Sequence, residues 1–119
     1  MMTSKEMLEI VVKAASDKRA EDIVALDMQN VSLLTDYFLI TDATSGRQVQ
    51  AISDSVQDAV EAAGIEVKRI EGRDAARWVM IDLGDVMVHI FQKDERAHYN
   101  LEKLWSEAPL VNVDEWVEA

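Results

Sequence analysis

The alternation of apolar and polar positions is clearest from Trp78 to Phe91, where the chain reads WVMIDLGDVMVHIF. The pattern predicts two strands joined by a tight turn at Gly84-Asp85, because glycine supplies the positive φ that the first central position of a two-residue hairpin loop needs. A loop of this length fixes which residues lie opposite one another. One face of the hairpin is then wholly aliphatic and belongs in a core. Its pairs are Leu83 with Val86, Ile81 with Val88, and Val79 with Ile90.

The other face of this hairpin carries two methionines, two aromatic rings, a histidine and a carboxylate. That composition is typical of the core of a protein interface more than of a solvated sheet face. Two interpretations are open: a helix of the same chain covers this face, as layered packing allows, or another protein covers it. The pairs on this face are Asp82 with Met87, Met80 with His89, and Trp78 with Phe91.

Helical and strand periodicities predict the remaining elements. Two capping boxes, Thr3 to Glu6 and Ser45 to Gln48, mark helix starts. The first helix is expected over about 4–18, and the second ends at Gly64, a left-handed cap. Strands are expected at 22–27, 37–41 and 66–70 besides the hairpin, and short helical turns at 95–99 and 101–105.

This element order predicts an α/β fold: one domain with a mixed five-stranded sheet flanked by helices. The path from strand 37–41 through the second helix to strand 66–70 can be a right-handed crossover between parallel strands. A length of 119 residues suits one domain with a real core. We place that domain at residues 1–107 and an acidic C-terminal tail at residues 108–119. The tail is expected to be loosely held from Pro109 onward.

Composition and charge narrow the classes of function. The chain has no cysteine, which excludes disulfides, thiolate catalysis and cysteine zinc sites. The first residues, MMTSKEMLEI, do not form a secretory signal or a transit peptide, so a cytoplasmic protein is expected. A formal net charge of −11 repels nucleic-acid phosphates and favours encounter with a basic protein surface. The same acidity also keeps a chain soluble, which is the more general explanation.

An enzyme is the alternative to a binding protein. Asp82, Asp85, Asp27 and Asp36 near strand ends could hold Mg²⁺ for nucleotidyl or phosphoryl transfer. Turn chemistry is the favoured explanation, because Asp85 forms the hairpin turn with Gly84. The helix start at 44–48 could bind an anion, but a simple capping box is favoured and no Walker-type loop is present. No catalytic residue, metal or cofactor is therefore expected.

Several stretches of the chain form an ordered set of motifs. They are Asp27, LLTDYFLIT at 33–41, Ser45 with Arg47 and Gln48, Glu71-Gly72, the hairpin 78–91, and the segment 96–105 that ends in NLEKLW. In this order and at these spacings they resemble the ribosomal silencing factors, also called the Iojap-like family. The resemblance covers about residues 5 to 107, and the tail after Pro109 lies outside it.

The resemblance implies a nucleotidyltransferase-like topology without catalytic motifs, and a homodimer. It also implies binding to a large-subunit ribosomal protein, the fourteenth in the usual numbering, on the face that meets the small subunit. Occupying that face would block subunit association and lower translation when nutrients are short. Neither a membrane nor a specific nucleic-acid sequence is an expected partner. The residues expected to bind the partner are Trp78, Met80, Asp82, Met87, His89, Phe91, Arg96 and Tyr99.

Overall fold

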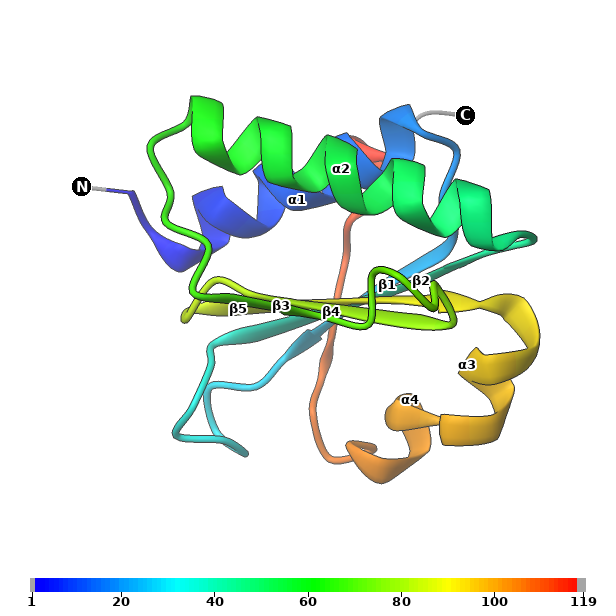
Figure 1. Cartoon of the computed structure of the whole chain (residues 1–119). Coiled ribbons are helices and arrows are strands. Elements are labelled where there is room, and N and C mark those ends of the chain that lie inside the picture. The colour runs from blue at the N-terminus through cyan, green and yellow to red at the C-terminus, as the bar shows by residue number, and fades with distance from the viewer. Residues whose placement is uncertain (1, 118–119) are drawn as a thin grey trace.

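A mixed β-sheet runs through the molecule and separates two layers of helices (Figure 1). The computed structural model describes residues 2–117, and these contain six strands where five were predicted. The strands are β1 (Glu21–Asp27), β2 (Tyr37–Ala43), β3 (Arg69–Glu71), β4 (Trp78–Asp82), β5 (Val86–Gln92) and β6 (Leu110–Val111). The helices are α1 (Ser4–Asp17), α2 (Gly46–Ala62), α3 (Lys93–Tyr99) and α4 (Leu101–Leu104), followed by a 3₁₀ turn, η1 (Asp114–Trp116).

The strands follow the order β3-β4-β5-β2-β1-β6 across the sheet. Strands β2 and β5 pair in parallel, and every other neighbouring pair is antiparallel. The predicted crossover from β2 through α2 to β3 does connect strands of the same direction. The hairpin β4–β5 lies between them, however, so β3 becomes an edge strand, shorter and later in the chain than predicted.

The register of the β4–β5 hairpin is the one predicted. Trp78 lies opposite Phe91 and Ile81 opposite Val88, and Gly84 has the positive φ, +87°, that the turn requires. The aliphatic face of the hairpin is buried in the main core, under α1 and α2 (Figure 1). The prediction that this face is core is therefore confirmed.

Helices α1 and α2 pack on the sheet through apolar stripes. In α1, Thr3 and Glu6 form the full capping box, with both reciprocal hydrogen bonds at 3.1 Å. At the start of α2, Ser45 accepts from the Gln48 backbone N–H at 3.2 Å, but the Gln48 side chain donates to the Arg19 carbonyl instead of closing the box. The second capping box is thus half formed, because the Gln48 amide joins α2 to the loop after α1.

The described part of the predicted tail, residues 110–117, is not loosely held, contrary to expectation, and residues 118 and 119 lie outside the described residues. Strand β6 pairs with β1, and the Asp27 backbone N–H donates to the Pro109 carbonyl at 2.8 Å. Val113 lies in the main core with 6% of its surface exposed. The physical reason is that β1 would otherwise leave its outer hydrogen-bonding groups unpaired. The division of the chain into residues 1–107 and 108–119 stays a prediction.

No helix within residues 2–117 combines the length and the apolar character that crossing a membrane would take.

The buried position of Ile81 gives a test of the hairpin register. Ile81 is fully buried in the main core, so Ile81→Ala should lower the free energy of unfolding by about 2–5 kcal/mol, as core truncations do. Leu34→Ala is a control, because Leu34 is 86% exposed, and its effect should stay within about 0.5 kcal/mol. Urea denaturation measures both. Equal effects of the two variants would contradict the assignment of faces.

Candidate functional site

The sheet face opposite α1 and α2, here called the second face, carries most of the predicted site residues. Cross-strand register arranges them in rows that extend onto β2 and β3. The rows are Arg69–Asp82–Met87–Phe38, Glu71–Met80–His89–Ile40, and Trp78–Phe91–Asp42. The structure thus brings Trp78, Met80, Asp82, Met87, His89 and Phe91 together on one face, as the hairpin register predicted.

The chain itself covers part of the second face. Phe91 is fully buried in a smaller core with Phe38 and Ile40 of β2 and with Leu101 and Ala108 from the α4 region. His89 and Met80 have only 5% and 9% of their surface exposed. Phe91 therefore lies beneath the surface, which corrects the expectation that it offers a direct contact, and His89 is exposed only slightly. The interpretation that the same chain covers this face holds for the β2 side of it.

The part of the second face that stays open lies over the β4–β5 hairpin. Trp78, Asp82 and Met87 are half-buried, and Tyr99 at the end of α3 is 46% exposed. We call these four residues the open patch. Whether they bind a partner stays a prediction.

Trp78 joins the open patch to the smaller core. Its ring stacks on Phe91 with centroids 5.0 Å apart and contacts the Tyr99 ring at 4.6 Å. Its indole N–H donates to Nδ1 of His89 at 3.1 Å. Truncating Trp78 would therefore cost folding stability as well as any binding.

His89 is a neutral core residue. The indole N–H can only donate, so Nδ1 of His89 must be the acceptor and the ring hydrogen sits on Nε2. Within residues 2–117, Nε2 has no hydrogen-bond partner. Burial lowers the pKa of His89 to about 4, because the charged imidazolium would lose its hydration.

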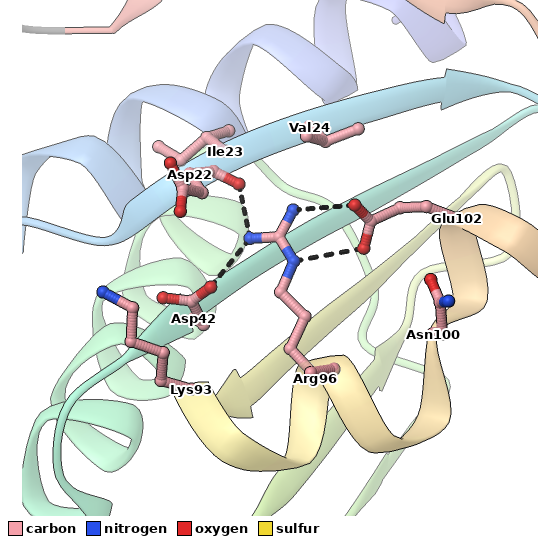
Figure 2. Close-up of a pocket in the computed structure, with 9 residues that line it drawn as sticks. Asp22, Ile23, Val24, Asp42, Lys93, Arg96, Asn100 and Glu102 are labelled. Atoms are coloured by element: carbon pink, nitrogen blue, oxygen red, sulfur yellow. Dashed lines mark hydrogen bonds and ion pairs between the residues drawn. The ribbon is translucent and has the colours of Figure 1, made fainter.

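Arg96, which was predicted to bind the partner, is an internal anchor. Its side chain is 11% exposed. It donates to the Asp22 carbonyl at 2.6 Å and to the Asp42 carboxylate at 2.9 Å, and two further bonds of 3.1 and 3.3 Å reach the Glu102 carboxylate (Figure 2). These bonds hold α3 against β1, β2 and α4, and so fix where Tyr99 lies.

Two carboxylates accept hydrogen bonds from the Arg96 guanidinium. Burial alone would lower the pKa of Arg96, but hydrogen bonds to Glu102 and Asp42 outweigh it and raise the pKa above its ordinary value. A hollow of about 660 Å³ beside this network is lined also by Lys93 and Asn100 (Figure 2). Asp42 follows the predicted end of strand 37–41, and its burial was not apparent from the sequence. A single acid placed directly after an apolar strand was the only available signal.

Two of the four carboxylates of the enzyme alternative, Asp82 and Asp27, accept hydrogen bonds within turns. Asp82 accepts the Gly84 backbone N–H at 2.8 Å, and Asp27 accepts the Gln29 N–H at 3.0 Å. Among residues 2–117, histidine and acidic side chains form no cluster of three or more that could hold a metal ion. Turn chemistry is the interpretation that the structure supports for Asp82 and Asp27.

Comparisons with known proteins agree with the architecture. The family model described as "Ribosomal silencing factor during starvation" matches residues 1–119. The chain is 57% identical over 113 residues to "Ribosomal silencing factor RsfS" of Bacillus subtilis, covering 95% of this chain and 96% of that protein. A crystal structure from Bacillus halodurans is similar with a TM-score of 0.82 and 54% identity, covering 91% of this chain and 98% of that one. A mouse protein named "Mitochondrial assembly of ribosomal large subunit protein 1" is 28% identical over 102 residues, 83% of this chain and 45% of its own length.

The lowered pKa of His89 makes stability depend on pH. Between about pH 6.5 and 4 the unfolded chain binds a proton at this position and the folded chain does not, so the free energy of unfolding should fall on acidification. The loss from this residue should reach about 3 kcal/mol. Denaturant titrations across this range measure it.

His89→Asn is the matched control, because its amide oxygen can still accept from Trp78 but does not titrate. The variant should show a clearly shallower dependence on pH over the same range. An unchanged slope would show that His89 is not the group responsible.

Proposed function

The chain belongs to the ribosomal silencing factor family, and from this membership we propose that it lowers translation by binding the large ribosomal subunit and blocking its association with the small subunit. The proposed partner is the fourteenth large-subunit ribosomal protein, on the face that meets the small subunit. The family is regulatory and not enzymatic, which sets the transferase alternative aside. The name of the mouse relative refers to the large ribosomal subunit and supports the large subunit as the partner.

The open patch is the observation that carries the proposal. It places the indole of Trp78 beside the phenol of Tyr99 on a sheet face that α1 and α2 do not cover. The thioether of Met87 lies on the same face, two cross-strand rows from Trp78. Tyrosine, tryptophan and methionine are enriched in the cores of protein interfaces. Beneath them, Phe91 and His89 form a packed and rigid base, so little ordering is required of the patch on binding. Rigid aromatic anchors of this kind are typical binding hot spots.

Charge supports a basic partner. With 23 acidic and 12 basic residues, the chain carries a formal net charge of −11. Asp82 belongs to the open patch, and Asp85, Asp94 and Glu95 follow near it in the chain. Such a surface steers a positively charged protein toward it, an effect that weakens as salt screens the charges. Ribosomal proteins that contact rRNA phosphates are basic, because lysine and arginine side chains neutralise the phosphates and release bound counterions.

The proposed mechanism depends on the size and position of the bound protein and requires no catalytic reaction. The described domain measures about 33 × 33 × 30 Å. A body of this size seated at the subunit interface prevents the small subunit from approaching. Because α3 is held by Arg96 and the patch by the smaller core, the protein can act as a fixed block without a change of shape.

Two further expectations remain proposals. The first is a homodimer, which the family resemblance implies. Sedimentation at micromolar protein concentrations tests this proposal, and a monomer at all concentrations would contradict it. The cytoplasm is the proposed location, since that is where bacterial ribosomes act.

Tyr99 gives a direct test of the proposed surface. Tyr99→Ala should weaken binding to purified large subunits by roughly 2 kcal/mol, because it removes an exposed aromatic contact from the open patch. Co-sedimentation over a range of concentrations measures the affinity, and a subunit-association assay should show a matching loss of inhibition.

Leu110→Ala is the control for this variant. Leu110 is 74% exposed on β6, the sheet edge farthest from β3, so the variant should bind as the wild type does. Full binding by Tyr99→Ala, or an equal loss in Leu110→Ala, would place the interface elsewhere. No binding of wild-type protein to large subunits would overturn the proposed function itself.

A further inference from the structure

A pocket of about 340 Å³ opens beside the open patch, at the β3 end of the sheet. It is lined by Glu71, Gly72, Trp78, Met80 and His89. Three of these residues, Glu71, Met80 and His89, form one cross-strand row on the second face. The pocket is thus a hollow in the sheet surface next to Trp78, where β3 ends the sheet.

Gly72 lines the pocket and lies close to the backbone of Trp78. Gly72 has φ +82°, and a Cβ atom there would lie 2.1 Å from the carbonyl oxygen of Trp78. Any other residue would force the backbone to move, because that distance is far below van der Waals contact. The close approach of Gly72 to Trp78 therefore fixes one wall of the pocket.

The walls and the rim of the pocket differ in chemistry. The walls are the Trp78 indole, the Met80 thioether and the neutral His89 ring. Glu71 stands at the rim with 59% of its side chain exposed. Its one ion pair among the described residues is to Arg69, at 3.8 Å between two exposed side chains, and such a pair contributes little. The Glu71 carboxylate is therefore available to a stronger partner.

We propose that this pocket receives a lysine or arginine side chain of the partner protein, with its alkyl stem against Trp78 and Met80 and its cation at Glu71. The proposal rests on the proposed function, and it specifies the chemistry of one contact. Long basic side chains bury their methylene groups on apolar surface while keeping the charge at an edge.

Other side chains fit the pocket less well. A carboxylate would meet Glu71 and be repelled. A purely apolar side chain would pack against the walls, but it would displace water from the Glu71 carboxylate without forming an ion pair with it. That loss of hydration costs free energy. A basic side chain can pack its alkyl stem against the apolar walls and pair its charge with the Glu71 carboxylate. The net charge of −11 on the chain also attracts a cation.

The test compares the rates of binding to purified large ribosomal subunits for wild type, Glu71→Gln and Glu71→Lys at physiological salt. Removing an ion pair that is buried in the complex changes mainly the dissociation rate. Removing a charge that only attracts the partner from a distance changes mainly the association rate. Glu71→Gln should raise the dissociation rate about five- to tenfold, and Glu71→Lys should raise it further. Thermal unfolding of each variant should match the wild type, because Glu71 is exposed.

Glu61→Gln is the matched control, because it removes the same charge from an exposed position on α2, across the sheet from the pocket. It should change the dissociation rate less than about twofold. If Glu71→Gln dissociates at the wild-type rate, or changes only association as the control does, the pocket does not seat a basic side chain, and the proposed function stands. If wild-type protein does not bind large subunits, the proposed function and this inference fail together.

Discussion

The register of the β4–β5 hairpin is the constraint on which the rest of the structure depends. The Gly84 turn, with its positive φ and the Asp82 carboxylate accepting the Gly84 N–H, sets which residues lie opposite one another. Side chains alternate between faces with a period of two, so a slip of one residue would exchange the two faces. The aliphatic set would then lose its place under α1 and α2, and the aromatic and methionine set would enter the main core. One turn thus decides both what stabilises the domain and what it presents to other molecules.

The second face serves two purposes because the chain covers only part of it. The segment from α3 to Ala108 lies over the β2 side and buries Phe91. Arg96 ties that segment to the Asp22 carbonyl and the Asp42 carboxylate. A buried arginine is favourable only when its donors are satisfied, and here they meet two carboxylates and a carbonyl. The result is a rigid base beneath a limited open patch, which suits a protein that acts by occupying space rather than by turning over a substrate.

The sequence predicted the parts of this fold that local pattern controls. The alternation of apolar and polar residues on both sides of Gly84-Asp85 predicted the hairpin. The capping residues Thr3 and Ser45 predicted where the two long helices begin. The eight proposed site residues were chosen from the same pattern and from the family resemblance, and the structure gathers six of them on one face. Local pattern could not show which of those six would be buried, since that depends on segments elsewhere in the chain.

Long-range contacts explain what sequence analysis missed. Two of the three partners of Arg96, Asp42 and Asp22, lie 54 and 74 positions away in the chain, so the sequence did not reveal that Arg96 is held inside the domain. Strand β6 has two residues, too few for any periodicity, and exists because β1 offers an unpaired edge. The pocket beside Gly72 arises from the approach of its backbone to Trp78, which only the folded chain brings together.

The central claim is that the open patch, and not the α1–α2 layer, meets the large subunit. Hydroxyl-radical footprinting of the protein, alone and bound to purified large subunits, tests it at individual side chains. The account predicts that oxidation of Met87 and Tyr99 slows on binding, while oxidation of Trp116, which packs on the main core from the C-terminal segment, does not change. Protection of Trp116 with unchanged oxidation of Met87 and Tyr99 would contradict it.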